Sequence, residues 1–222
     1  MLRNLTAALL AFGIAWPALA GVRTLPPVDE AARKPSFLAY RARLKEAVAR
    51  RDADALLRLV SAQIQVGFGP GERGLDAFIE KWHPRDSESR LWIELDRILA
   101  LGGQFMGSAA EATFCAPYVY SAFPEALDPF SHQVVISESV AARAAPRGNA
   151  RVVARIGYAI VRTDIPPRIA SDDEGRRWVE IKLDGNTTAY VPENALRSPV
   201  GYRACFAESG GAWKMVSFVG GD

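Results

Sequence analysis

The sequence is poor in the side chains that most enzymes use for nucleophilic or metal-assisted chemistry. Its 222 residues include two cysteines, Cys115 and Cys205, and two histidines, His83 and His132. A cysteine peptidase pairs its cysteine with a histidine base, and neither cysteine lies in the local sequence of that class. A zinc amidase needs several histidine or carboxylate ligands, whereas these two histidines are isolated and lack H-E-x-x-H spacing. We therefore predict no metal site and no catalytic residue of these two classes.

Other catalytic and cofactor motifs are also missing. No G-x-S-x-G segment occurs, which argues against a serine hydrolase. The glycine-rich run 69–74 lacks the Lys-Ser/Thr of a phosphate-binding loop and the G-x-G-x-x-G spacing, so we predict no cofactor. Carboxylates are common between residues 72 and 96, mostly on predicted polar helix faces, and the sequence leaves open whether two of them face each other as in a glycosidase. The simplest expectation is that the protein is not an enzyme.

The chain also lacks a charge excess and, after residue 20, any long hydrophobic run. Its formal net charge is +2 at pH 7, without the clustered Lys and Arg typical of nucleic-acid binding. We therefore predict no nucleic-acid partner. No later stretch is apolar enough to cross a bilayer, so we also predict no membrane span.

The first 20 residues have the pattern of a signal peptide. Arg3 supplies a positive charge, residues 5–16 form an uncharged apolar run, and Ala18-Leu19-Ala20 gives the small-x-small pattern of a cleavage site. Cleavage is expected between Ala20 and Gly21, and the absence of cysteine at position 21 argues against a lipid anchor. The predicted location is the periplasm or the outside of the cell.

The first part of the mature chain has helical patterning. Residues 21–35 contain three prolines and predict an extended linker. Ser36 and Asp52 are placed to cap two helices, and a third is predicted over 75–82. A fourth begins at Ser87 or Ser89 and runs to residue 99. Residues 36–131 are therefore predicted to form an α+β domain.

The last hundred residues change to short β-rich runs separated by turn residues. Two runs at 202–206 and 213–219 flank Ser209-Gly210-Gly211 and predict a β-hairpin within the C-terminal segment 200–222. The predicted fold class is α+β, with an N-terminal helical or α+β domain, a small β-barrel and this closing hairpin.

Residues 138–198 resemble the bacterial SH3 (SH3b) family, a small barrel common in exported envelope proteins. The motifs that carry the resemblance follow in the family's order: Val140-Ala141-Ala142-Arg143-Ala144-Ala145-Pro146, Ile156-Gly157, Trp178-Val179-Glu180-Ile181, Asp184-Gly185 and Ala189-Tyr190-Val191-Pro192-Glu193-Asn194-Ala195-Leu196-Arg197. The resemblance implies an SH3-like barrel that binds peptidoglycan, its peptides or an envelope protein, or that serves as a scaffold.

Three aromatic residues of this segment are candidates for ligand binding: Tyr158, Trp178 and Tyr190. For each of them a role in the barrel core is the alternative. The sequence departs from the family at Ala189, where glycine is usual, and in the long polar segment 164–176. Both departures could alter the face on which a ligand docks.

The first part also resembles the NTF2-like family of α+β cones. The resemblance rests on residues 46–56, on Gly74-Leu75-Asp76-Ala77-Phe78 leading to Trp82, and on Gly211-Ala212-Trp213-Lys214-Met215. It implies that segment 200–222 returns to the first sheet and that the SH3-like barrel is an insertion. It also implies an alternative function, a small-molecule binder or enzyme with a pocket in residues 36–131.

The two cysteines lie in the two parts of the chain that this topology would join. Cys115 is on a strand-like stretch and Cys205 is on the final hairpin, so a disulfide between them would tie both ends together across the barrel. Two buried free thiols are the alternative, and the sequence does not decide between them.

Overall fold

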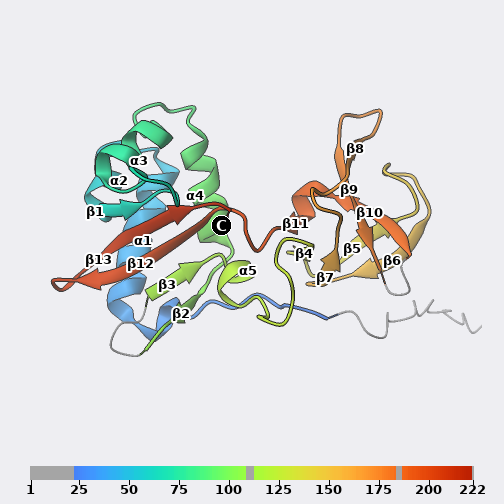
Figure 1. Ribbon diagram of the computed structural model, residues 1–222, viewed down its shortest axis with the longest axis horizontal. Coiled ribbons are helices and arrows are strands. Elements are labelled where there is room, and N and C mark those ends of the chain that lie inside the picture. The colour runs from blue at the N-terminus through green and yellow to red at the C-terminus, as the bar shows by residue number, and fades with distance from the viewer. Residues whose placement is uncertain (1–22, 109–112, 184–186, 222) are drawn as a thin grey trace, which may run out of the picture.

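The computed structural model describes residues 23–108, 113–183 and 187–221, which form two lobes with one β-sheet each (Figure 1). The combination of helices and sheets confirms the predicted α+β class. The predicted signal peptide 1–20, its cleavage site at Ala20 and Gly21, and the Asp184-Gly185 turn lie outside the described residues. Within the described residues, no helix is long and apolar enough to cross a membrane.

The first lobe places four helices against a five-stranded sheet. The helices are α1 (Pro35–Ala49), α2 (Ala53–Leu59), α3 (Leu75–Trp82) and α4 (Arg90–Ala100). The strand order is β1 (Val60–Gln65), β13 (Ala212–Val219), β12 (Arg203–Ser209), β3 (Thr113–Ala116) and β2 (Gln104–Met106). β1 runs parallel to β13, and the other pairs are antiparallel. The C-terminal hairpin therefore lies in the sheet of the first lobe, next to β3. Residues 117–202 leave that sheet after β3 and return to it at β12.

Local capping explains where these elements begin. The Asp52 carboxylate accepts a hydrogen bond from the Ala55 amide at 2.9 Å and caps α2, as predicted. The Ser89 hydroxyl accepts from the Leu91 amide and caps α4, which settles the choice between Ser87 and Ser89. Ser36 does not cap α1, because the helix already begins at Pro35, a residue favoured at the first helical position.

Aromatic side chains fill the interior of the first lobe. Phe37 of α1 lies 4.3 Å from Phe114 and 4.9 Å from Trp213, measured between ring centroids. Tyr40 and Phe206 extend the cluster, and all five side chains are at least 96% buried. This packing holds α1 on the sheet and occupies the space between them.

The second lobe is an eight-stranded sheet with its own apolar core. Its strands are β4 (His132–Val135), β5 (Val140–Arg143), β6 (Val152–Ile156), β7 (Ile160–Arg162), β8 (Ile169–Ser171), β9 (Arg177–Lys182), β10 (Thr188–Pro192) and β11 (Leu196–Arg197). The order is β11-β4-β7-β9-β10-β5-β6, and β8 pairs with β9. A 3-10 turn, Glu193–Ala195, joins β10 to β11.

The predicted closed barrel is not found in this lobe. Within the described residues no pairing joins β11 to β6, the two ends of the strand order, and β11 is only two residues long. Nevertheless, Val135 of β4 and Ile156 of β6 share one core cluster with Val179 and Val191. The lobe is therefore an open sheet that curls around its apolar residues.

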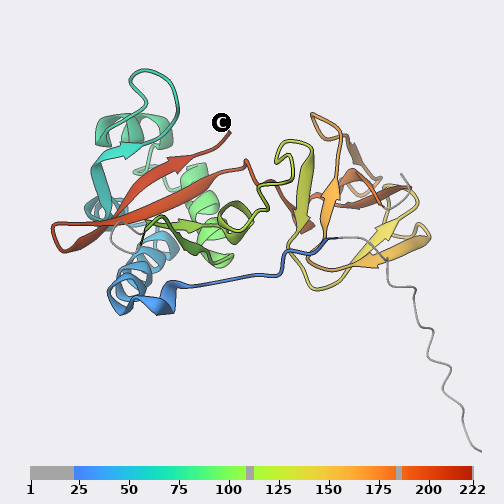
Figure 2. The same ribbon diagram turned by 60° about the horizontal axis from the view of Figure 1, so that its bottom comes forward.

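The described part of the predicted linker is extended up to a short 3-10 helix, Ala31–Arg33, and it packs against both lobes. The Leu25 amide donates to the Tyr158 carbonyl at 2.7 Å, and the Glu30 amide donates to the Gly103 carbonyl at 2.9 Å. Figure 2 shows this N-terminal segment running between the two lobes. Leu25 also packs with Tyr118 of α5 (Tyr118–Ser121), a short helix that follows β3.

The disulfide between Cys115 and Cys205, one of the two alternatives that the sequence left open, is present in the structure. It joins β3 to β12, where the two residues lie directly opposite each other with their Cα atoms 4.2 Å apart. The bond lies inside the first sheet, where residues 117–202 leave it and return to it. The disulfide therefore joins the two chain segments that lead into and out of the second lobe, and it lies outside that lobe.

Candidate ligand groove

A groove of about 610 Å³ lies on the second lobe. It is formed by strand β5, the loop between β5 and β6, the hairpin between β8 and β9, and the turn after β10. The lining residues are Val140, Ala141, Arg143, Gly148, Gly175, Arg176, Arg177, Trp178, Pro192, Glu193 and Asn194. These residues are far apart in the sequence and are brought together by the pairing of β5, β9 and β10.

Trp178 is the largest apolar side chain in the groove. It is 97% buried, and Pro192 lies opposite it in the β9–β10 ladder. Its indole Nε1 donates a hydrogen bond to Asp172 Oδ2 at 3.0 Å. Because the buried indole nitrogen has a partner, the ring is held in one orientation beneath the groove.

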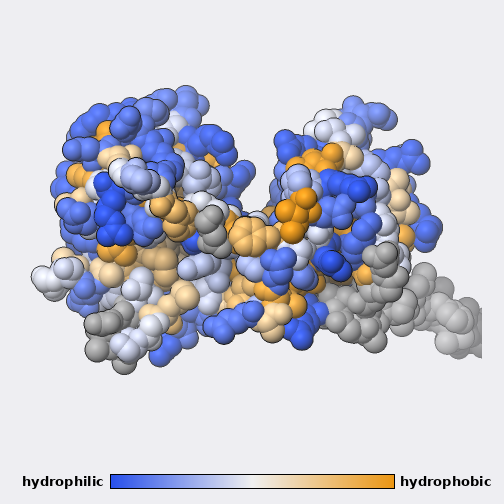
Figure 3. Space-filling model, in the orientation of Figure 1, coloured by the Kyte–Doolittle hydropathy of each residue, from blue (hydrophilic) through white to orange (hydrophobic). Residues whose placement is uncertain are grey.

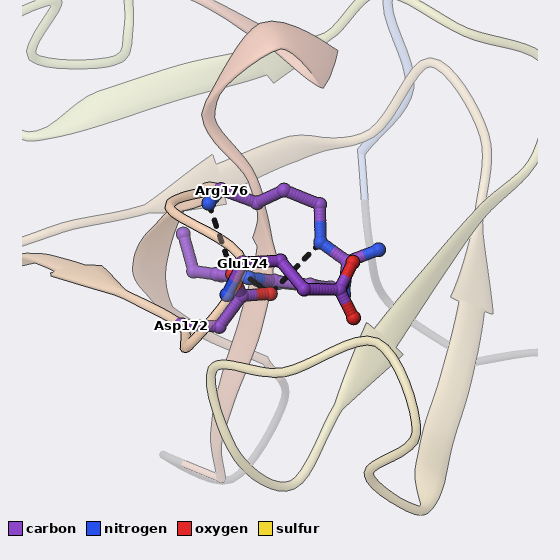
Figure 4. Close-up of polar contacts among 4 residues, drawn as sticks. Asp172, Glu174 and Arg176 are labelled. Carbon is purple, nitrogen blue, oxygen red and sulfur yellow. Dashed lines mark hydrogen bonds and ion pairs between the residues drawn. The ribbon is translucent and has the colours of Figure 1, made fainter.

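The β8–β9 hairpin is braced by the carboxylate of Asp172 (Figure 4). Asp172 Oδ1 accepts from the backbone amides of Glu174 and Arg176 at 3.1 and 2.9 Å, and Oδ2 accepts from Arg176 Nε at 2.8 Å. The Arg176 guanidinium also pairs with Glu174 at 3.1 Å. Burial alone would raise the pKa of Asp172, but the hydrogen bonds from Trp178 and Arg176 outweigh it and lower the pKa to about 2.

The opposite wall of the groove is the loop between β5 and β6. Arg143 fixes this loop, because its Nη1 donates to the Ala150 carbonyl at 2.7 Å. Gly148 lies against the Arg176 guanidinium so closely that an added Cβ would be 2.6 Å from Nη2. The glycine therefore allows the loop and the hairpin to meet across the groove.

The rim of the groove is positively charged. Arg143, Arg176 and Arg177 line it, and Glu193 is the one acidic residue in its lining. Arg177 Nε pairs with Glu193 Oε2 at 2.6 Å, and the two side chains are 56% and 40% exposed. An exposed pair of this kind is weak and can exchange partners, so Arg177 is accessible to a carboxylate ligand.

The structure does not bring the three predicted aromatic residues together. Trp178 lines the groove, whereas Tyr190 is not among the lining residues, and its hydroxyl donates to Glu180 Oε2 at 3.2 Å. Burial and the neighbouring Glu180 raise the pKa of Tyr190. Tyr158 lies at the junction of the lobes and has a left-handed backbone conformation. Its carbonyl accepts a hydrogen bond from the Leu25 amide.

Several groove residues belong to the motifs of the family resemblance, but those motifs do not indicate a site. Arg143 belongs to the opening V-x-x-R-x-x-P run, and Glu193 and Asn194 follow Pro192 in the closing motif. Gly148 and Asp172 lie outside these motifs. The one sequence feature that pointed to this part of the groove was the long polar segment 164–176, which contains Asp172 and Arg176.

A second hollow, of about 290 Å³, lies between the lobes and contains a buried ion pair. Figure 3 shows the molecule hollowed between its two lobes. Glu94 Oε2 of α4 lies 3.6 Å from Arg197 Nη1 of β11, and their side chains are 9% and 14% exposed. Burial lowers the pKa of Arg197, and Glu94 opposes that shift. The pair links the first lobe to the second.

The comparisons with known proteins give no match. No protein-family model matches this sequence, and no curated protein and no solved structure was found to be similar to it. Within the described residues, no group of three or more His, Cys, Asp or Glu side chains is arranged to hold a metal ion. The assignment of function therefore depends on the groove and on the sequence.

Proposed function

We propose that this protein is a non-catalytic component of the bacterial cell envelope whose second lobe binds peptide, most simply the stem peptide of peptidoglycan. The observation that carries the proposal is the groove with Trp178 beneath it and three arginines around it. This groove belongs to the segment that resembles the SH3b family. A segment of another envelope protein with the same chemistry is the second source of such a peptide.

The chemistry of the groove suits a short acidic peptide. An arginine guanidinium pairs with a carboxylate through two parallel hydrogen bonds, and peptidoglycan stem peptides carry free carboxylates. Val140, Ala141 and Pro192 offer apolar contact above the buried Trp178 for the aliphatic part of the peptide. Asn194 offers a polar contact at the edge.

Two independent features support the proposal that the protein is exported from the cytoplasm. The N-terminal 20 residues have the pattern of a signal peptide, and a disulfide between Cys115 and Cys205 persists in oxidising compartments such as the periplasm. Both features favour the periplasm or the outside of the cell.

The NTF2-like alternative has less support. Its cone-shaped pocket would lie in the interior of the lobe, between α1 and the sheet, but Phe37, Phe114 and Phe206 fill that space. A ligand there would have to displace aromatic side chains from the core.

Sedimentation with purified peptidoglycan tests the proposal. The protein from Gly21 onward should pellet with the polymer, and Arg177→Ala should reduce the bound fraction several-fold. Arg168→Ala is the matched control, because Arg168 is also an exposed, ion-paired arginine of the second lobe but does not line the groove. Equal retention of both variants, or no retention of the unmodified protein, would count against wall binding.

A further inference from the structure

A second groove, of about 500 Å³, lies on the first lobe, far in sequence from the groove on the second lobe. It is formed by α1, α2 and the start of β13. Its lining residues are Arg43, Glu46, Ala47, Arg50, Asp52, Ala55, Arg58, Leu59, Ala212, Trp213 and Lys214. Four of these side chains are cationic and two are acidic, although the whole chain is almost neutral.

Both acidic residues of this groove already have partners. Glu46 pairs with Arg50 at 2.9 Å, one helical turn away on α1. The Asp52 carboxylate is used to cap α2 through the Ala55 amide. A neutral amide donor leaves the charge of Asp52 in place, so the four cationic and two acidic side chains give the lining a net charge of +2.

The remaining cations have no anionic partner. Among the described residues, the guanidinium groups of Arg43 and Arg58 make no hydrogen bond or ion pair, and both residues are exposed. Lys214 Nζ donates to the Arg58 carbonyl, a neutral acceptor, and among the described residues it forms no ion pair either. The groove thus holds three cationic groups without an ion pair, against an apolar wall that includes Leu59 and Trp213.

We propose that this groove binds a ligand bearing a phosphate group. Two guanidinium groups and an ammonium group in one cavity match the several oxygens and the multiple negative charge of a phosphate ester or diphosphate. The apolar wall accommodates the organic part of the ligand. The ligand is either a soluble phosphate ester or the phosphate headgroup of an anionic lipid. The experiment below distinguishes these two sources.

The test measures binding of pyrophosphate by calorimetry and of phosphatidylglycerol vesicles by flotation, with phosphatidylcholine vesicles for comparison. The test variant is Arg43→Gln with Arg58→Gln. The matched control is Lys45→Gln with Arg73→Gln, which removes the same charge from exposed residues of the same lobe outside the groove. All four positions are exposed, and a thermal unfolding curve for each variant verifies folding.

We expect pyrophosphate binding that weakens about tenfold or more in the groove variant and stays within about twofold in the control. Binding to phosphatidylglycerol alone, lost in the groove variant and retained in the control, would identify a lipid headgroup as the source of the phosphate. The proposal is overturned if neither probe binds, or if both variants lose binding equally, since the latter would reflect overall charge. The proposed peptide site is unaffected by either result, because none of these residues lines it.

Discussion

Cys115 and Cys205 lie directly opposite each other on neighbouring antiparallel strands, and the disulfide between them closes the chain at the base of the second lobe. The two residues are 90 positions apart, so the bond restricts a long loop of the unfolded chain. Because strand pairing already places them together, the bond acts mainly on the unfolded state.

Replacement of both cysteines by alanine should therefore keep the fold and lower its stability. The chain-entropy model for a loop of this length predicts a decrease of about 4 to 5 kcal/mol in the free energy of unfolding. Urea unfolding of the double variant and of the oxidised protein measures it. A decrease below about 1 kcal/mol would show that the disulfide contributes little to stability.

The stability of the fold should depend on pH through the ionisation of the Asp172 carboxylate. Its pKa is about 2 in the folded protein and near 3.8 when unperturbed, so the folded state binds a proton less readily. The contribution of this carboxylate to stability is therefore complete above about pH 4 and is lost as the pH falls towards 2. Asp172→Asn should lower the melting temperature at neutral pH, and the difference from the unmodified protein should shrink towards pH 2. The control is Asp173→Asn, which removes an exposed carboxylate next in sequence and should show no such convergence.

Glycine at position 148 should matter for ligand binding more than for folding. An added Cβ meets the end of the flexible Arg176 side chain, which can move away at small cost. Gly148→Ala should leave the unfolding curve nearly unchanged and weaken peptide binding up to about tenfold, because Arg176 leaves its place in the groove. A double variant with Arg176→Ala should bind no more weakly than Arg176→Ala alone. Additive losses would show that Gly148 acts by another route.

The ion pair between Glu94 and Arg197 should contribute to the joint between the lobes. Glu94→Gln leaves the buried guanidinium without its counter-charge and should lower the free energy of unfolding by about 3 kcal/mol. Glu88→Gln, which breaks an exposed pair with Arg51, should cost less than about 1 kcal/mol. Similar losses in both variants, measured by urea unfolding, would contradict this role.

Features encoded by nearby residues could be predicted from the sequence. Helix α3 spans Leu75–Trp82, as its apolar spacing indicated, and the turn of the C-terminal hairpin uses Gly210 and Gly211 in the left-handed backbone that glycine favours. Placing Cys115 and Cys205 on strands made their disulfide one of two alternatives, and the structure contains it.

Features that depend on distant contacts could not be predicted in this way. The groove arises where three loops meet, and no local pattern states that Gly148 will touch Arg176 or that Arg177 will pair with Glu193. The structure also does not confirm the barrel implied by the family resemblance, because within the described residues no pairing joins the two-residue β11 to β6. The groove and the strand pairing of the second lobe are set by tertiary packing, which no local sequence pattern encodes.

The most direct test of the proposed function is an NMR titration of the isotope-labelled protein from Gly21 onward with soluble peptidoglycan stem peptides. We expect saturable shifts at the Trp178 indole and at the amides of residues 143–150, 172–178 and 193–194, which surround the groove. No saturable change, or changes confined to residues outside these segments, would contradict the proposed function.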